Sequence, residues 1–383
     1  MAATGVAGRL EDELGRLDAA GLRRGLALPA GVDFSSNDYL GLGGDAGFAA
    51  EVARRVQRAA AAGEALFAPA SRLLRGHLPV HARLEERVAR FKGAEAALLL
   101  PSGWQANAAL LTGLLRPEDR VLSDERNHAS LIDGLRAARC ERVVVPHLEL
   151  EAYARALAAP RPAGQLFVVV ESLFSMDGDL APLADLAHLC RRHDASLLVD
   201  EAHATGLYGE PRGSGRIEAC GVEREVLASV TTFGKALAVQ GAAIAGPRRL
   251  IELLVNRARP LIFSTALSPL LAHAAEAALD LTEREPERRR RVHVNAGRLR
   301  ARLADAGLGV ERAGSPIVPV VVGDNRRAVE VARRVRERGF DVRAVRPPTV
   351  APGTARLRVS VHADHGEAQL DGLAAAIVEE LAR

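Results

Sequence analysis

The chain is poor in several residue types, and each shortage excludes a class of protein. Its 383 residues include three cysteines, Cys140, Cys190 and Cys220, an odd number at wide spacing. This pattern offers neither a disulfide framework nor the spacing of a zinc site, and it favours a reducing compartment. Aromatic residues make up 3% of the chain, and no apolar run reaches the length that crosses a bilayer. We therefore expect no membrane span and no metal centre.

The sequence also has little net charge and no visible targeting segment. The net charge is +3 and the sequence pI about 9.0, with arginines spread along the whole chain. A spread of this kind does not indicate a nucleic-acid partner, although an acidic or phosphorylated substrate is compatible with it. No apolar stretch of the secretory type follows the first residues, so we expect a cytoplasmic protein.

Lysine is the rarest cation, since it occurs only at Lys92 and Lys235 while the other basic side chains are arginines. Lys235 follows Gly234 and is surrounded by small apolar residues. Arginine stays protonated, whereas a desolvated lysine can become a free amine nucleophile. The pattern predicts that Lys235 forms a Schiff base. The alternative is a surface lysine that escaped the bias toward arginine.

Short apolar strands alternate with helical segments through the first two thirds of the chain. The expected strands are 96–100, 120–123, 142–146, 165–170, 196–199 and 226–230, and helices are expected at 9–28, 48–63, 80–92 and 248–259. This alternation is typical of an α/β fold with a mostly parallel sheet. Beyond a helical connector interrupted at Pro286, strands near 317–322, 341–345 and 355–361 indicate a smaller α+β domain. We predict an N-terminal helix and connecting segment at 1–45, a large domain at 46–260, and a connector helix with the small C-terminal domain at 261–383.

Polar residues follow five of these strands. They are Ser102, His128, Ser175, the pair Asp200 and His203, and Lys235. Ligands bind at the carboxyl ends of strands in open α/β sheets, so these side chains predict one site. An amine, a carboxylate that can pair with a ring nitrogen, two histidines and a Ser-Gly turn at a helix start meet the needs of pyridoxal 5′-phosphate.

Seven motifs carry a resemblance to a known family. They are Ser-Ser-Asn-Asp-Tyr-Leu-Gly-Leu (35–42), Ser-Gly-Trp-Gln-Ala-Asn (102–107), His-Ala-Ser-Leu (128–131), Phe-Ser-Met-Asp-Gly-Asp (174–179), Val-Asp-Glu-Ala-His-Ala-Thr-Gly (199–206), Thr-Phe-Gly-Lys (232–235), and Arg-Pro-Pro-Thr-Val (346–350) with Gly-Thr-Ala-Arg-Leu-Arg (353–358). With these motifs the chain resembles the α-oxoamine synthases, which are fold-type I pyridoxal-phosphate enzymes with an aminotransferase-like architecture. The similarity runs from about Leu22 to the C-terminus.

The resemblance implies a role for each matched residue. Lys235 would hold the cofactor and remove the amino-acid α-proton, Asp200 would pair with the ring nitrogen, His203 with the ring 3′-oxygen, and His128 would stack on the ring. The other cofactor contacts would come from Ser102, Gly103, Trp104 and Thr232 at the phosphate or ring edge, Ser175 near the ring hydroxyl or acyl group, and Ser264 and Thr265 at the partner subunit's phosphate. The substrate contacts would come from Asn37 and Arg358 at the amino-acid carboxylate and from Arg23 and Arg346 in the acyl-donor channel.

The activity that the resemblance implies is an acyl transfer in biotin synthesis. L-Alanine would condense with a pimeloyl thioester, carried by CoA or by acyl carrier protein, with loss of carbon dioxide. The sharing of Ser264 and Thr265 implies a homodimer. One alternative is a related enzyme, such as a glycine C-acetyltransferase, that uses another amino acid and acyl-CoA. A second alternative is a catalytically inactive homologue that acts as a partner subunit. The presence of Lys235, Asp200 and His203 argues against this alternative.

Some features depart from the family pattern or need no role in the reaction. Phe67-Ala-Pro-Ala70 stands where relatives often have a glycine-rich run, only Gly25–Val32 connects the first helix to the Ser-Ser-Asn-Asp motif, and Glu201 replaces a frequent aspartate. We interpret His77, His81, His147, His188 and His193 as structural or exposed, and Glu171 as a support for the site. The run 288–291 is expected to be a solvated helix face, with a carrier-protein patch as the alternative.

Overall fold

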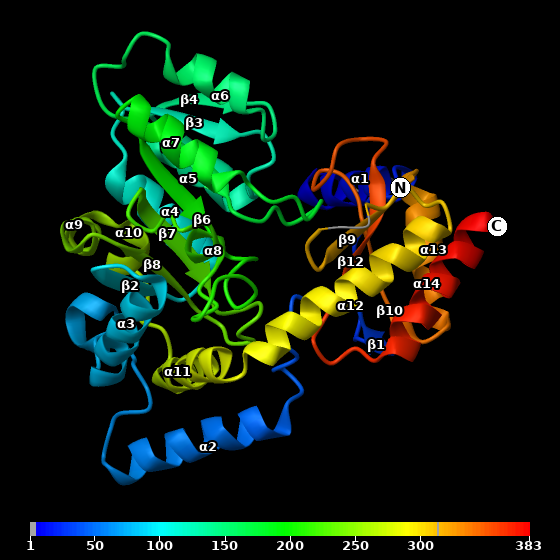
Figure 1. Ribbon diagram of the computed structural model, residues 1–383, viewed down its shortest axis with the longest axis horizontal. Helices are drawn as coiled ribbons and strands as arrows, with labels where there is room; N and C mark the ends of the chain where they lie inside the picture. Colours follow the sequence, from blue (N-terminus) through cyan, green and yellow to red (C-terminus); the bar gives the residue numbers. More distant parts are fainter. Residues whose placement is uncertain (1–4, 312–313) are drawn as a thin grey trace. The chain divides into compact units, whose positions relative to one another are not determined.

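The computed structural model describes residues 5–311 and 314–383 (Figure 1). The chain forms two compact units. The larger unit consists of Asn37–Ser175 and Asp179–Val292, and the smaller one of residues 5–36, Met176–Gly178 and His293–Arg383. The division into domains at 1–45, 46–260 and 261–383 stays a prediction.

A seven-stranded sheet organises the larger unit. Its strands are β2 (Ala96–Leu100), β3 (Arg120–Asp124), β4 (Glu141–Val145), β5 (Leu166–Glu171), β6 (Ser196–Asp200), β7 (Val226–Thr232) and β8 (Ala242–Gly246). They lie in the order β2-β8-β7-β6-β5-β3-β4. All pairs from β7 to β4 are parallel, whereas β8 runs antiparallel to both β2 and β7. The predicted α/β fold with a mostly parallel sheet is confirmed.

Helices cover both faces of this sheet (Figure 1). The helical segments of the unit are α2 (Ala46–Ala61), η1 (Arg72–Gly76), α3 (Pro79–Lys92), α4 (Gly103–Leu114), α5 (Ala129–Ala138), α6 (Leu150–Leu157), α7 (Leu183–Arg192), α8 (Arg216–Cys220), α9 (Arg248–Arg257), α10 (Arg259–Ile262) and α11 (Pro269–Arg284). Side chains alternate along each strand, so Val169 and Leu198 pack with α4, α5, α9 and α10, while Val168 and Val199 pack with α6, α7 and α8. Burial on both faces explains why these strands are continuous apolar runs.

The smaller unit is an α+β assembly. It contains α1 (Gly5–Ala19), β1 (Val32–Asp33), β9 (Ile317–Gly323), α13 (Asn325–Glu337), β10 (Phe340–Asp341), β11 (Arg343–Val345), β12 (Ala355–Ser360) and α14 (Glu367–Ala382), and α12 (Pro286–Asp305) enters it from the larger unit. The antiparallel sheet has the order β11-β12-β9, and β1 pairs in parallel with β10. Leu299, Val335, Leu357 and Leu373 lie in its apolar core.

Three local predictions were wrong. The helix predicted at 9–28 ends at Ala19, because Gly21 adopts a left-handed conformation that breaks the helix. The strand β8 was missed, since its three alanines, one isoleucine and one glycine carry no periodic signal of their own. The run 288–291 is only partly a solvated face, because Arg289 is buried and donates to Thr282 and Glu210.

Within the described residues, no helix combines the length and the apolar character that crossing a membrane requires.

Candidate active site

Lys235 lies in the loop that connects β7 and β8, residues 233–241. The Thr232 hydroxyl donates to the Gly241 carbonyl at 3.2 Å and accepts from the Gly234 amide at 3.3 Å, which closes the turn at its base. Gly241 has a φ of +138°, and a Cβ there would approach the Phe233 ring within 2.9 Å. The sequence therefore needs glycine at this position, and the turn fixes the backbone that presents the half-buried Lys235.

Asp200 ends β6 at the centre of the same sheet. It is buried, and it lies in register with Val230 on β7 and Glu171 on β5. Its Oδ2 accepts from the Asn107 amide at 2.7 Å and its Oδ1 from the Ala202 amide at 2.8 Å. A carboxylate has about four acceptor positions, so Asp200 retains capacity for a further donor. That is the property required of a partner for a protonated ring nitrogen.

His128 is the N-cap residue of α5. Its Nδ1 accepts from the Ser130 amide at 3.2 Å, and its ring meets the Trp104 ring edge-on at 6.1 Å between centroids. Burial lowers the pKa of His128, the negative charge of Asp200 opposes this effect, and the Lys235 ammonium adds to it. The result is an imidazole that is neutral at neutral pH. A neutral, fixed aromatic ring suits the predicted stacking on a flat ligand ring.

Glu171 is a buried carboxyl group beside these charges. Burial and the neighbouring Asp200 raise its pKa to about 8, although Lys235 and the backbone N–H of His128 favour the anion. Its Oε1 has no hydrogen-bond partner among the described residues. Because Lys235 acts on both His128 and Glu171, the structure places these predicted residues in one electrostatic environment.

His203 is joined to the N-terminal motif through a tyrosine. The Tyr39 hydroxyl lies 2.8 Å from Nδ1 of His203 and donates to Oδ1 of Asn37 at 3.2 Å. Both rings are buried and meet edge-on. The structure thus brings Asn37 and His203 together, although they are 166 residues apart in the sequence (203 − 37).

The predicted phosphate residues gather at the start of α4. Ser102 is its N-cap and accepts from the Gln105 amide at 3.3 Å. The Gln105 side chain donates to Ser264 at 3.2 Å, and a Cβ on Gly103 would lie 3.5 Å from Thr232. The backbone of Thr265 pairs with that of Ser71 in an isolated antiparallel β-bridge. Ser102, Gly103 and Thr232 therefore lie at the amide-rich end of one helix, where anions are stabilised. Ser264, which is predicted to reach the partner subunit's phosphate, contacts the Gln105 side chain of the same helix.

Four further predicted residues are Ser175 in the larger unit and three arginines in the smaller unit. Ser175 is buried at the end of the segment that follows β5. Arg23, Arg346 and Arg358 belong to the smaller unit. There, Arg346 donates to the Gly21 carbonyl, Arg23 pairs with Asp18, and Arg358 donates to Ser360 at 2.8 Å. Their roles toward a substrate stay predictions.

Sequence reasoning did not assign Asn107, Ser130 or Tyr39. Asn107 donates to Asp200 and, at 2.8 Å, to the Ser130 hydroxyl. A signal was present, because Asn107 is an amide within a helix of small apolar residues, and a buried amide requires polar partners. The identity of those partners depends on contacts that the sequence pattern does not reveal.

The other lysine is part of a buried ion pair. Nζ of Lys92 donates to Glu201 Oε2 at 2.7 Å and to the Ser214 carbonyl at 2.5 Å, and both charged side chains are excluded from water. The second Glu201 oxygen accepts from the Ile217 amide at 3.0 Å. A Cβ on Gly215 would lie 2.4 Å from the Glu201 carboxylate, so this glycine is required by the close approach. The pair fixes the segment that carries His203.

His147 bridges two carboxylates outside the candidate site. Its Nδ1 lies 2.8 Å from Asp124 and its Nε2 3.1 Å from Asp179. Although burial alone would lower it, these two hydrogen bonds raise the pKa of His147 to about 9. The predicted structural role of this histidine agrees with these contacts, as does that of His81, which contacts the Leu267 carbonyl at 2.7 Å.

Replacing His147 by glutamine should reduce stability in a pH-dependent way. The pKa is raised in the folded state, so the charged bridge contributes fully below about pH 6.5 and is lost as the pH rises through about 9. We expect the free energy of unfolding to fall by about 2 kcal/mol at pH 6, with the difference narrowing by pH 10. Urea unfolding across this range checks the prediction, and a difference that does not change with pH would contradict it.

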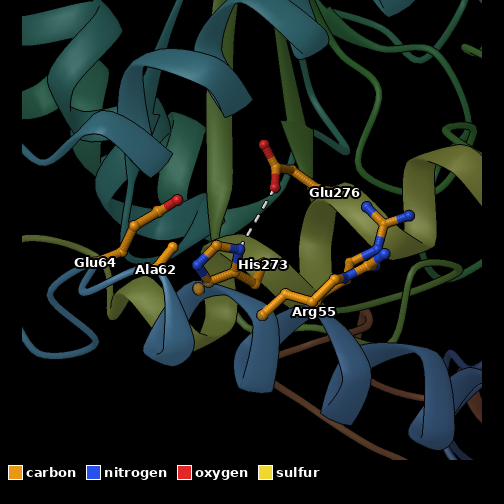
Figure 2. A pocket seen from close by; sticks show the side chains of 7 residues that line it. Arg55, Ala62, Glu64, His273 and Glu276 are labelled. Carbon is orange, nitrogen blue, oxygen red and sulfur yellow. Dashed lines mark ion pairs between the residues drawn. The ribbon is translucent and has the colours of Figure 1, made fainter.

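A separate pocket lies between α2 and α11 (Figure 2). Its lining consists of Arg55, Arg58, Ala59, Ala62, Glu64, His273 and Glu276. Nδ1 of His273 lies 3.7 Å from Glu276, but burial lowers the pKa of His273 and raises that of Glu276, so burial opposes the charged pair. None of the predicted site residues lines this pocket, and it is not the candidate active site.

One histidine cluster in the smaller unit has the composition of a metal site, namely His362, Asp364 and His365. Nδ1 of His365 accepts from the His362 amide at 3.0 Å and its Nε2 contacts the Asp33 carbonyl at 2.8 Å. Both ring nitrogens are therefore engaged in hydrogen bonds. His365 thus connects the segment at Asp33 with the segment that follows β12. Because both of its ring nitrogens are occupied, it is not arranged to bind a metal.

The donor set fits pyridoxal phosphate. An amine on a rigid turn, a buried carboxylate with spare acceptor capacity, a neutral histidine and a helix N-terminus are the groups that this cofactor requires. Lys235, Asp200, His128 and Ser102 supply them from elements of one compact unit.

Comparison with known proteins supports this fit. The profile of the family "Aminotransferase class I and II" matches residues 29–377. A curated 8-amino-7-oxononanoate synthase from Anaeromyxobacter dehalogenans is 48% identical over 96% of this chain and 94% of its own, and one from Geobacter sulfurreducens is 42% identical over 95% and 96%.

Two solved structures are similar over most of the chain. A serine palmitoyltransferase from S. paucimobilis, solved with a bound PLP–myriocin compound, has a TM-score of 0.89 and 26% identity and covers 98% of both chains. The 8-amino-7-oxononanoate synthase from Francisella tularensis has a TM-score of 0.78 and 25% identity, over 92% of this chain and 98% of that chain.

Fold and site together define a fold-type I enzyme that depends on pyridoxal phosphate. The cofactor prediction and the predicted fold family are confirmed. The chain belongs to the class I and II aminotransferase family and, within it, to the 8-amino-7-oxononanoate synthases, which are C-acyltransferases of biotin biosynthesis.

Proposed function

We propose that the protein condenses L-alanine with a pimeloyl thioester, releases carbon dioxide, and forms 8-amino-7-oxononanoate. One observation carries this choice of substrates: the full-length identity of 48% to a synthase named for that product. The site geometry supports the type of chemistry, because it combines an amine with a buried carboxylate and a neutral histidine. The acyl group would be carried by CoA or by acyl carrier protein.

The cofactor, when bound, supplies a ring that accepts electrons from the substrate's α-carbon. Lys235 is the proposed covalent anchor and the base that moves the α-proton. A lysine amine can perform both tasks because it loses its proton readily when it is desolvated, which an arginine does not. The closed turn at Thr232 and Gly241 would keep this amine in one position during both steps.

Three residues would orient the cofactor. The Asp200 carboxylate would hold a proton on the ring nitrogen, since an anion in a buried position favours the protonated form. Asn107 keeps that carboxylate in place. His128 would cover one face of the ring, and its neutral form would avoid a positive charge against the protonated ring.

Asn37 has a specific proposed contact with the substrate, whereas the other predicted substrate residues have only general roles. Asn37 would donate its amide to the amino-acid carboxylate, because its carbonyl oxygen already accepts from Tyr39. Arg23, Arg346 and Arg358 keep the substrate roles predicted from the sequence, and Ser175 keeps its predicted role near the ring hydroxyl or the acyl group. Fixing two reactants over one ring would supply much of the rate acceleration.

A homodimer is the proposed assembly. Large apolar side chains are exposed on two segments of the larger unit that pack together, namely Phe67, Leu73, Leu74 and Phe263. The amide of Ala266 donates to the Ala70 carbonyl at 3.0 Å, which joins these segments next to Ser264 and Thr265. Several exposed apolar residues in one place are typical of an interface, and a second copy seated there would bring its cofactor to Ser264 and Thr265.

The proposed location is the cytoplasm. The thiols of Cys140, Cys190 and Cys220 are free. Free thiols in a biosynthetic enzyme are compatible with a reducing compartment.

Release of carbon dioxide tests the proposed substrates. Purified protein with pyridoxal phosphate should release it from L-alanine with pimeloyl-CoA or pimeloyl acyl carrier protein, and the two donors should be compared directly. Omission of either substrate is the matched control. Robust turnover with another pair and none with alanine and the pimeloyl thioester would disprove the proposal.

The second candidate is another α-oxoamine synthase activity. It is favoured by one observation, the higher TM-score of 0.89 to serine palmitoyltransferase than the 0.78 to the synthase from F. tularensis. The same assay with L-serine and palmitoyl-CoA, or with glycine and acetyl-CoA, separates these possibilities.

A further inference from the structure

Tyr39 contacts two residues of the candidate site through one atom. Its side chain is fully buried, and its hydroxyl lies 2.8 Å from Nδ1 of His203 and 3.2 Å from Oδ1 of Asn37. The proposed function gives tasks to Asn37 and His203 but none to Tyr39. A buried hydroxyl shared by two functional side chains requires its own explanation.

The protons of these three groups can be counted. A tyrosine hydroxyl has one hydrogen, which it donates to Oδ1 of Asn37. Toward His203 the same oxygen can therefore act only as an acceptor, so Nδ1 of His203 must carry a hydrogen. The chain of donation runs from His203 through Tyr39 to Asn37.

This direction fixes both ends of the chain. A neutral imidazole has one N–H, so His203 with its hydrogen on Nδ1 presents a lone pair at Nε2. At the other end, the carbonyl oxygen of Asn37 faces Tyr39, and the NH₂ group is the end that can donate to a carboxylate. A flipped amide would instead direct its oxygen at the carboxylate, which is repulsive.

The two segments that hold these residues have little freedom to compensate for a lost contact. Asp38 accepts from the amides of Leu42 and Gly43 at 2.9 and 2.7 Å, which closes the turn around Tyr39. The turn that carries His203 is closed by Thr205, whose hydroxyl donates to the Glu201 carbonyl at 3.0 Å.

The two turns also pack against each other. A Cβ on Gly206 would lie 3.4 Å from Leu40 and 2.8 Å from Ala236, so the turn of His203 touches both the neighbour of Tyr39 and the neighbour of Lys235. Removal of the hydroxyl alone would therefore leave the backbone in place.

We propose that Tyr39 is a positioning residue that sets the amide orientation of Asn37 and the protonated nitrogen of His203 through one directed hydrogen-bond chain. This inference rests on the proposed function for the identity of the two ligands, a substrate carboxylate at Asn37 and the cofactor's ring oxygen at His203. Through Tyr39, the binding of the amino acid is coupled to the histidine that faces the cofactor.

The substitution Tyr39→Phe tests the proposal, because it removes the hydroxyl and keeps the ring. Tyr153→Phe is the matched control, since Tyr153 is equally buried and its hydroxyl also contacts a side chain, Asp124 at 3.3 Å. Thermal unfolding of both variants shows whether the fold is retained.

The first readout needs neither cofactor nor substrate. In ¹⁵N NMR of the apo-protein, with the signal assigned by its loss in His203→Gln, neutral His203 should carry its hydrogen on Nδ1. In Tyr39→Phe the hydrogen should move to Nε2, and in Tyr153→Phe it should stay. Wild-type protein with the hydrogen on Nε2, or an unchanged tautomer in Tyr39→Phe, would overturn the proposal.

The second readout is the division between KM and kcat. With whichever amino acid the enzyme turns over, Tyr39→Phe should raise its KM about tenfold, the effect of one misoriented hydrogen bond to a charged group, and change kcat by less than about threefold. Tyr153→Phe should change neither by more than about twofold. A tautomer change with an unchanged KM would overturn the coupling. Failure of the alanine assay would disprove the proposed substrates but leave both readouts interpretable.

Discussion

Replacement of Lys235 by alanine should abolish turnover, lowering kcat/KM by at least about 10⁴-fold. Alanine can neither hold the cofactor covalently nor move the α-proton, so two steps lose their reacting group. The visible absorbance of the lysine-bound cofactor should vanish at the same time. Lys235→Arg should lose both as well, because arginine keeps the charge but cannot act as an amine nucleophile.

The scarcity of lysine makes the covalent link easy to locate. Borohydride reduces a C=N bond to a stable amine, so it should leave the cofactor's mass on the peptide that contains Lys235. Lys92 is the only other lysine, and its ammonium is buried against Glu201. A label on the Lys92 peptide, or retained absorbance in Lys235→Ala, would show that the assignment is wrong.

Replacement of Lys92 by methionine should lower the free energy of unfolding by about 3–5 kcal/mol. Methionine fills a similar space but leaves the Glu201 carboxylate buried without a cation. The Ile217 amide would remain as its hydrogen-bond donor, and the Ser214 carbonyl would lose the Lys92 donor. The loss is large because a charge that is buried without its partner retains the cost of desolvation.

A double substitution separates the lost charge from lost packing. Lys92→Met combined with Glu201→Gln removes both charges, so it should be less destabilised than Lys92→Met alone. Arg136→Ala, which breaks an exposed ion pair with Asp133 at 3.0 Å, serves as the control and should change stability by about 0.5 kcal/mol or less. Urea unfolding of the apo-proteins measures all three. Equal losses in the single and double variants would contradict the buried-charge explanation.

Most strands of the seven-stranded sheet could be predicted from the sequence. Because both faces of the sheet are buried, each of these strands is a continuous run of apolar residues. The runs at 166–170 and 196–199 are examples, and β5 and β6 occupy them. The boundary of α1 and the strand β8 could not be predicted in the same way. The end of α1 depends on one glycine in a left-handed conformation, and the alanine-rich sequence of β8 resembles a helical segment as much as a strand.

The sequence predicts the candidate site as a set of residues but not as a network of contacts. Lys235, Asp200, His203 and His128 stand at strand ends, and parallel strands bring such ends to one edge of a sheet. The pattern could not show which side chain holds Asp200, because Asn107 reaches it across 93 positions of the sequence.

The sequence by itself determined the α/β alternation of apolar strands and helices and the cofactor, and it predicted a site at the strand ends. Those properties follow from local patterns of apolar and polar residues. Only the tertiary structure decided that Asn107 holds Asp200, that Lys92 neutralises Glu201, and that Tyr39 joins Asn37 to His203. These contacts connect residues that are 93, 109 and 164 positions apart, and the choice of partner depends on how the backbone folds between them.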